Sequence, residues 1–274
     1  MEIFAISDLM CRLDSQIKIF EANKKDGIMS RNKIFYDENF TQDDINEIFK
    51  ETRIKLGEKH GFNGLRMIQA SQKTETNNVK YPDGKYISIK DKILTTDDYW
   101  YLNLEADILM INNKYKGIVI GNMCADCPIV IAEDRKKGVT ALAHCGAAYI
   151  DRNLPYQIIE SLKKEYSSNS EDIYVYISSG AKKENFIYDT YPHWAKNDDV
   201  WIGCIDKKDN KYQIDMYKAI INQLKKQEIK NIEISEIDTI TNQDYASHYC
   251  RIRGQENKSG QNFVGFFYKK KKKK

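Results

Sequence analysis

The sequence lacks any apolar run long enough to cross a bilayer, and its first 30 residues contain neither a basic leader nor an apolar stretch of signal-peptide length. These absences predict a cytoplasmic protein with no membrane partner. No linker rich in Pro, Gly or Ser divides the 274 residues. We therefore expect a single domain over residues 1–268 and a disordered, solvated lysine tail over residues 269–274.

A strong charge of either sign is also missing. The chain has 43 basic and 40 acidic residues, but its last six residues are all lysine, so the remainder has 37 basic against 40 acidic residues and a net charge of −3. Such a body is not typical of a nucleic-acid-binding surface, and no specific nucleic-acid partner is expected. In a reducing compartment the six cysteines are expected to be thiols or metal ligands rather than disulfides.

Short apolar runs alternate with segments of helical periodicity. This alternation predicts an α/β (α+β) fold with mixed sheets. Helices are expected at residues 41–56, 154–166 and 216–227, the first capped by Thr41 and the last by Asp215. Strands are expected as a pair within residues 2–22 and at residues 65–70, 86–89, 107–111, 117–120, 128–132, 139–144, 173–177, 232–237 and 263–268.

The segment around residues 117–149 contains a thiol and an imidazole between buried strands. Cys127 precedes the strand at 128–132, His144 ends the strand at 139–144, and a polar turn ending in glycine joins the two strands. If these strands are neighbours, Cys127 and His144 emerge at the same open end of a hairpin. A thiol and an imidazole placed together can form a nucleophile with its base, or two ligands of a metal.

Cys124 and Cys127 also form a C-x-x-C motif, which suggests redox chemistry or half of a zinc site. Redox motifs of this kind open a helix, whereas a strand-like run follows here. The sequence has no second C-x-x-C, and a four-ligand site that includes both His144 and Cys145 is disfavoured because neighbours on a strand face opposite ways. A buried, inert thiol is the alternative for the cysteines other than Cys127.

Two further segments suggest an anion site. Residues 178–181 (SSGA) form a small-residue loop in which the backbone at Gly180 can approach an anion, although a simple turn is an equal alternative. Residues 245–254 combine hydroxyls and an imidazole with Arg251 and Arg253, whose planar guanidinium groups suit phosphate. The alternative for this segment is a surface turn with salt bridges.

The order of these motifs resembles the laccase-domain (YfiH-type) family, whose members were once called multicopper polyphenol oxidases and are regarded as zinc-dependent purine nucleoside phosphorylases. Residues 124–128 (CADCP) are similar to the family motif T-A-D-C-x-P, and residues 144–149 (HCGAAY) to H-A-G-W-R-G. Weaker similarities to Q-V-H-G, D-A-L-V-T, G-P-x-I, S-Y-R-R and T-G-R lie at residues 69–72, 107–111, 177–180, 247–251 and 259–261. The resemblance implies a layered α/β/β/α sandwich similar to the catalytic fold of cytotoxic necrotizing factors.

The family's metal ion is held by the histidine of Q-V-H-G, the cysteine of A-D-C and the histidine of H-A-G-W-R-G. By position, the resemblance implies that Cys127 and His144 are catalytic and metal-binding, while Ser71 stands where the first histidine belongs. A hydroxyl is a poor zinc ligand, and a catalytic zinc normally has three protein ligands. The alternatives are weak zinc with water in the gap, a substitute ligand such as His248, or no metal; copper is the second choice of metal.

The implied activity is phosphorolysis of a purine nucleoside to the free base and ribose 1-phosphate, with adenosine deamination as a second reaction. Adenosine, inosine or guanosine and phosphate are the implied partners of a monomer or homodimer. Phosphate is expected to bind at Arg251, Tyr249 and the backbone near Gly180.

Three further positions depart from the family motifs: Ala147 and Ala148 replace its Trp and Arg, and Gln261 replaces the Arg of T-G-R. These changes remove cations, for which Arg251 and Arg253 can compensate. Two other functions therefore stay open. One is a metal-independent amidase or deamidase with Cys127 as nucleophile and His144 as base, and the other is a degenerate member that binds nucleosides or a partner protein.

Overall fold

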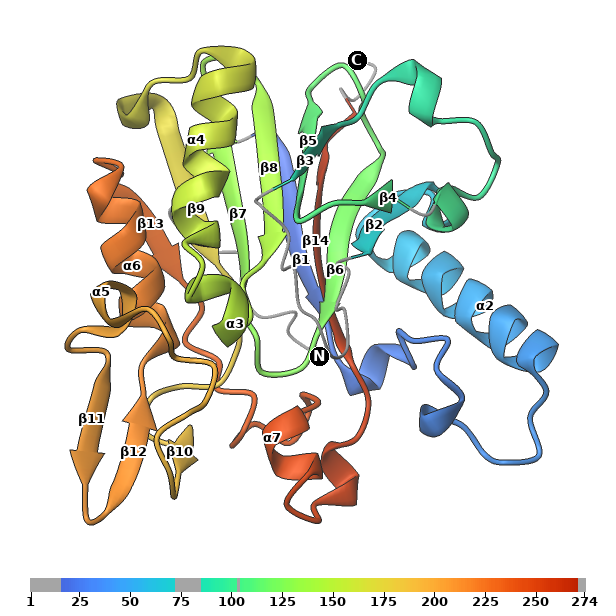
Figure 1. The fold of residues 1–274 in the computed structure, drawn as a ribbon. Helices are drawn as coiled ribbons and strands as arrows, with labels where there is room; N and C mark the ends of the chain where they lie inside the picture. Colours follow the sequence, from blue (N-terminus) through green and yellow to red (C-terminus); the bar gives the residue numbers. More distant parts are fainter. Residues whose placement is uncertain (1–15, 72–84, 103, 271–274) are drawn as a thin grey trace.

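The computed structural model describes residues 16–71, 85–102 and 104–270. Two large sheets lie face to face, and helices cover their outer faces (Figure 1). Helices α4 (Leu154–Tyr166) and α6 (Met216–Lys226) lie on one sheet, and α2 (Gln42–His60) lies on the other. This is the predicted α/β/β/α sandwich with mixed sheets. Residues 2–15 and most of the lysine tail lie outside the described residues, so the first strand expected there is not tested.

The six-stranded sheet contains the predicted hairpin. Its antiparallel centre pairs Ile129 with His144 at one end and Asp134 with Val139 at the other. The Asp134 carboxylate accepts the N–H groups of Lys136 and Lys137 at the turn, and Gly138 has the positive φ of 64° that the turn requires. The strand order is β13 (Asn231–Ile234), β9 (Ile173–Ile177), β7 (Ile129–Asp134), β8 (Val139–His144), β5 (Ile108–Asn112), β3 (Tyr86–Ser88).

The five-stranded sheet contains a strand longer than predicted. The sequence predicts a strand at residues 117–120, but β6 runs from Val119 to Cys124 and pairs throughout with β14. Gly121 reads as a loop residue in the sequence, yet it leaves room for Phe263, whose ring atom lies 2.1 Å from where a Cβ would stand. The strand order is β1 (Ile17–Ala22), β14 (Asn262–Tyr268), β6 (Val119–Cys124), β2 (Met67–Ser71), β4 (Leu104–Glu105).

The strands expected at 65–70 and 232–237 also have different boundaries in the structure. The strand expected at 65–70 begins at Met67, because residues 64–66 form a 3-10 turn capped by the Asn63 side chain. The strand expected at 232–237 ends at Ile234, where its partner β9 also ends. In both cases the apolar pattern continues beyond the residues that have a neighbour to pair with.

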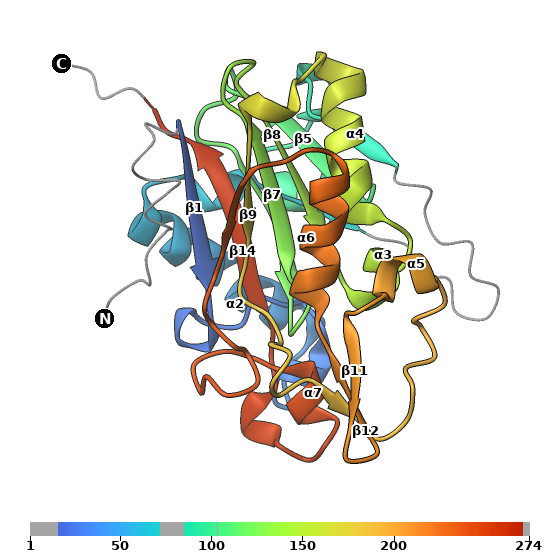
Figure 2. The same ribbon diagram turned by 90° about the vertical axis from the view of Figure 1, so that its left-hand side faces the viewer.

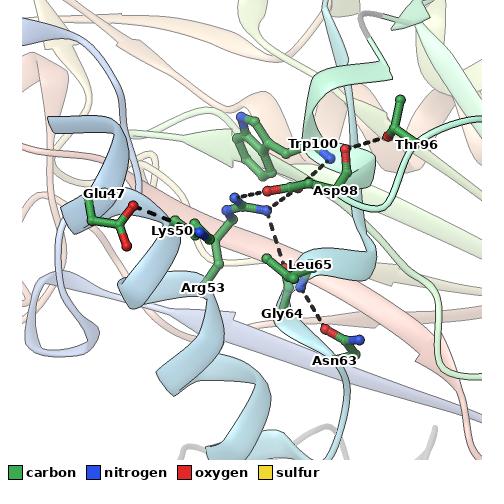
Figure 3. Close-up of polar contacts among 9 residues, drawn as sticks. All are labelled: Glu47, Lys50, Arg53, Asn63, Gly64, Leu65, Thr96, Asp98 and Trp100. Atoms are coloured by element: carbon green, nitrogen blue, oxygen red, sulfur yellow. Dashed lines mark hydrogen bonds and ion pairs between the residues drawn. The ribbon is translucent and has the colours of Figure 1, made fainter. Parts of the chain in front are cut away.

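Helix α2 begins at the predicted cap and continues one turn further than predicted. Thr41 and Asp44 form a reciprocal capping box, and Gly61 ends the helix in the left-handed conformation. Arg53 is fully buried on the inner face of this helix (Figure 3). Its guanidinium donates two hydrogen bonds of 2.7 Å to Asp98 and lies 5.5 Å from the Trp100 ring. This pair ties α2 to the loop before β4.

Three hydrophobic cores follow from the layers. Leu142 on β8 packs between the two sheets, while its neighbours Ala141 and Ala143 pack under α4 and α6. The third core lies between α2 and the five-stranded sheet. Side-chain alternation along β8 therefore has the predicted effect, because each face of this sheet meets a different layer.

Several short elements were not predicted, since each has too few residues to show a periodicity. A small sheet and α7 lie together at one end of the sandwich (Figure 2). The described part of the chain has no helix that is both long and apolar enough to span a membrane. The short elements are β10 (Ile187–Tyr188), β11 (Ile205–Lys208), β12 (Lys211–Ile214), α3 (Ala147–Ile150), α5 (Asp198–Trp201), α7 (His248–Arg251), η1 (Lys24–Asp26), η2 (Lys33–Phe35), η3 (Gly64–Arg66), η4 (Asp91–Ile93), η5 (Tyr99–Leu102), η6 (Ser170–Asp172), η7 (Glu256–Lys258).

Candidate functional site

Cys127 and His144 lie together at the open end of the β7–β8 hairpin. The Cys145 N–H donates to the Pro128 carbonyl at 2.9 Å, which extends the ladder one step beyond Ile129 and His144. Gly146 follows, and a Cβ added to it would stand 3.1 Å from the Cys127 Sγ and 3.9 Å from the His144 Nε2. The thiol and the imidazole therefore flank the same point. Their catalytic and ligand roles stay predictions.

Burial sets the protonation of this pair. It raises the pKa of Cys127 to about 12, with the Asp126 charge adding to the effect and the Ala147 N–H, which donates to the thiol, opposing it. Burial also lowers the pKa of His144 to about 4. At neutral pH, without a metal, the pair is a protonated thiol beside a neutral imidazole. Because the thiolate is the reactive nucleophile, the amidase alternative would require His144 to take the thiol proton during the reaction.

Asp126 holds the segments around Cys127 together, a role that the sequence did not reveal. It has a positive φ of 81° and is 5% exposed. Its carboxylate accepts the Tyr249 N–H at 2.6 Å and the Thr239 hydroxyl at 2.7 Å, and its carbonyl accepts the Ala181 N–H at 2.9 Å. The only sequence signal was a carboxylate inside the C-x-x-C motif.

Helix α7 places Tyr249 beside this carboxylate, and Arg253 follows in the turn after the helix. Ser247 caps the helix by accepting the Cys250 N–H at 3.2 Å. The Tyr249 hydroxyl donates to the Ile187 carbonyl at 2.6 Å, and the Arg253 guanidinium lies 3.6 Å from the centre of the Tyr249 ring. Within the predicted cluster of hydroxyl and guanidinium groups, Tyr249 therefore contacts both Arg253 and β10.

Arg251 has a different neighbour. Its Nη2 lies 3.1 Å from the His248 Nδ1. Over residues 16–71, 85–102 and 104–270, no carboxylate forms an ion pair with Arg251 or with Arg253. The Arg253 guanidinium is held by backbone carbonyls instead, since its Nη1 and Nη2 donate to Tyr249 at 3.2 Å and to Ile187 at 3.4 Å. A phosphate-binding role for the two arginines stays a prediction.

Tyr188 on β10 forms an aromatic wall with its neighbours, a role that no sequence pattern indicated. Its ring meets Phe186, Tyr249 and Trp194 edge-on, with centroids 5.2, 6.0 and 6.2 Å away. Burial raises the pKa of Tyr188 to about 12, while Arg253 lowers it and Cys127 contributes to the rise. The Tyr188 hydroxyl is therefore close enough to the Cys127 thiol for the charge of one to affect the pKa of the other.

Gly180 does not have the predicted orientation. Its N–H donates to the Ile237 carbonyl at 3.4 Å, so this group is used inside the fold and not directed to an anion. A Cβ at this position would stand 2.7 Å from the Asp126 carbonyl oxygen and 2.9 Å from the Tyr217 hydroxyl. Glycine is needed here for close packing under Asp126.

The described residues around the pair do not form the three-ligand metal site that the sequence resemblance implies. Ser71 ends β2 opposite Glu105, and its side chain lies outside the described part of the structure. Among the described residues, no three His, Cys, Asp or Glu side chains gather in a group that could hold a metal. His248 is exposed and contacts Arg251, and it does not gather with Cys127 and His144 into such a group. Cys127 and His144 supply two donors, and a hydroxyl at the third position is a poor zinc ligand.

Known proteins share both the sequence pattern and the fold. Residues 22–265 match the family described as multi-copper polyphenol oxidoreductase laccase. Over 171 residues the chain is 29% identical to a purine nucleoside phosphorylase of Clostridium acetobutylicum, a match that covers 61% of this chain and 68% of that protein.

Two solved structures share the fold. Bacillus licheniformis hypothetical protein YfiH aligns with a TM-score of 0.70 at 16% identity and covers 93% of both chains. YlmD from Geobacillus stearothermophilus aligns with a TM-score of 0.67 at 16% identity and covers 82% of this chain and 81% of that one. At this identity the likeness concerns the fold alone.

Proposed function

Because the chain belongs to the multi-copper polyphenol oxidoreductase laccase family, we propose that it is a purine nucleoside phosphorylase. The observation that carries the proposal is the meeting of Cys127 and His144 around Gly146, at the positions of the family's A-D-C and H-x-G motifs. A relative named purine nucleoside phosphorylase supports the choice of reaction.

In the proposed reaction an oxygen of hydrogen phosphate attacks C1′ of the nucleoside. A new C1′–O bond forms as the C1′–N9 bond breaks, and the bonding electrons leave with the purine. The proton of the hydrogen phosphate goes to the departing base, so the products are ribose 1-phosphate and neutral purine. The enzyme contributes mainly by placing the two reactants together and by stabilising charge.

The groups of the candidate site suit these two tasks. Arg251 has no carboxylate partner in the described part of the chain, and its positive charge suits the phosphate dianion. Arg253 adds a second positive charge, although its Nη1 and Nη2 donate to the Tyr249 and Ile187 carbonyls. Tyr188 and Tyr249 offer aromatic surfaces for a purine ring. Cys127 and His144 flank the Gly146 position, at which a reacting group or a metal would stand.

Metal dependence is a separate question within this proposal. The described side chains supply a thiol and an imidazole, so any tightly bound zinc needs a further ligand. Metal binding deprotonates a thiol, and it would therefore have to overcome the raised pKa of Cys127. We expect weak zinc binding that becomes weaker as the pH falls.

The decisive experiment is chromatography of adenosine, inosine and guanosine after incubation with the pure protein and phosphate, with and without zinc. The Cys127→Ala variant tests the site, and Cys204→Ala, which removes a buried thiol on the loop after α5, is the matched control. We expect free purine base from the wild type and from Cys204→Ala, and none from Cys127→Ala. Equal product from all three proteins would refute the assignment of Cys127. No product from the wild type under any condition would contradict the proposed function.

A further inference from the structure

Lys258 is a buried cation held by the backbone alone. It ends η7 and is 1% exposed. Its Nζ donates to the carbonyl oxygens of Thr239 at 2.9 Å, Asn242 at 2.5 Å and Tyr245 at 3.4 Å. An ammonium group has three donors, so these three carbonyls use its whole capacity.

This environment is unusual for a lysine. Lysine is almost never fully buried without a charged partner, and burial lowers the pKa of Lys258 from its ordinary value. A cluster of carbonyl oxygens around one positive charge is instead the arrangement by which proteins coordinate monovalent cations such as potassium. The lysine ammonium occupies the centre of such a cluster.

The three carbonyls belong to the segment 239–245, which leads directly into the candidate site. At its start, the Thr239 hydroxyl donates to the Asp126 carboxylate at 2.7 Å. Two residues after its end, Ser247 caps α7 and donates its own N–H to the Lys258 carbonyl at 3.0 Å. Without a cation, the carbonyl dipoles would point at one another across a buried space and repel.

We propose that Lys258 acts as a tethered monovalent cation that positions the segment 239–247, and with it Asp126 and α7, around Cys127. Removal of its side chain leaves a carbonyl-lined site that takes ammonium or potassium from solution. Lys258 is a positioning residue in this proposal, since it contacts neither Cys127 nor a substrate. The proposal is independent of which reaction the protein catalyses.

The test uses the full chain and its variants Lys258→Ala, Lys258→Met and Lys24→Ala. Lys24 is the matched control because its Nζ also donates to a nearby carbonyl, that of Asn257 at 2.6 Å, but it does so at the exposed surface. Each protein is melted in ammonium, potassium or choline chloride at equal ionic strength. The iodoacetamide labelling rate of Cys127 is measured in parallel by peptide mass spectrometry.

For Lys258→Ala we expect a lowered melting temperature and several-fold faster labelling of Cys127 in choline chloride, with a saturable return toward wild type in ammonium or potassium. Lys258→Met fills the space without a charge. We therefore expect it to show the lowered melting temperature and the faster labelling of Cys127, but no rescue by ammonium or potassium. Lys24→Ala should match the wild type in all three salts. The proposal is overturned if Lys258→Ala behaves alike in the three salts, if Lys258→Met is rescued, or if Lys258→Ala is as stable as the wild type. If Lys258→Ala does not fold even in ammonium, the proposal is also overturned.

Discussion

The Asp126 carboxylate and the Tyr249 N–H meet at 2.6 Å although 123 positions separate them in the chain. This contact places the N-terminal turn of α7 against the residue that precedes Cys127. The same carboxylate also accepts the Thr239 hydroxyl, so one buried side chain orders two segments around the thiol.

Replacement of Asp126 should therefore lower the free energy of unfolding and disturb the arrangement of the segments around Cys127. Asp126→Ala leaves the Tyr249 N–H and the Thr239 hydroxyl without an acceptor and places alanine at a positive φ, so we expect a loss of about 3 kcal/mol in the free energy of unfolding. Asp126→Asn keeps one acceptor and a side chain that tolerates this φ, so its loss should be smaller. Urea denaturation measures both values, and equal stabilities of the two variants would contradict this role.

Tyr188 should contribute to binding of the purine in the proposed reaction. Loss of an aromatic stacking surface costs about 1–3 kcal/mol per base, so we expect Tyr188→Ala to raise KM by roughly tenfold with a smaller change in kcat. Tyr191→Ala is the control, because Tyr191 is 47% exposed and packs on Tyr212 instead. Steady-state kinetics with inosine provide the measurement. Similar KM values for the two variants would remove Tyr188 from the site.

His60 should make the protein less stable as the pH falls. It is 4% exposed, stacks on Phe20 at 4.7 Å, and has no hydrogen-bond partner for either ring nitrogen in the described part of the chain. Burial lowers its pKa from 6.5 to about 4, with Lys18 and Lys59 adding to the effect and Asp26 opposing it.

In the unfolded chain this histidine takes up a proton near pH 6.5, whereas in the folded protein its pKa is about 4. The contribution of neutral His60 is therefore fully present above the unfolded pKa and is lost as the pH falls toward the folded pKa. We expect about 3 kcal/mol less stability at about pH 4 than at about pH 7 from this residue. Denaturation of wild type and His60→Phe across this range isolates the effect. Parallel stability curves would show that His60 does not cause it.

The buried pair of Arg53 and Asp98 should be essential for the docking of α2 (Figure 3). Asp98→Ala leaves the fully buried guanidinium without its carboxylate, so we expect a loss of about 3 kcal/mol. The control is Lys50→Ala on the same helix, which breaks an exposed 3.8 Å pair with Glu47 and should cost less than about 0.5 kcal/mol. Chemical denaturation compares the two, and a similar small loss for both would mean that Asp98 does not hold α2.

The local elements of this protein could be predicted from its sequence alone. The β7–β8 hairpin, the cap at Thr41 and helix α4 all follow from patterns within about 20 residues, because hydrophobic periodicity, caps and turns act between near neighbours. The hairpin alone was sufficient to bring Cys127 and His144 to one end. The motifs were likewise sufficient to identify the family.

The assembly of the rest of the site depends on contacts that form only in the folded chain. Asp126 and Tyr188 act through contacts with Tyr249, far away in the chain, and no local pattern encodes such a partner. Lys258 reaches backbone carbonyls only 13 to 19 positions before it, but no sequence motif indicates that they converge on its ammonium group. The orientation of Gly180 was decided in the same way, because its N–H found an acceptor inside the fold. The protonation of Cys127 depends on burial as well, since only the folded chain removes water from the thiol and makes its charged form costly.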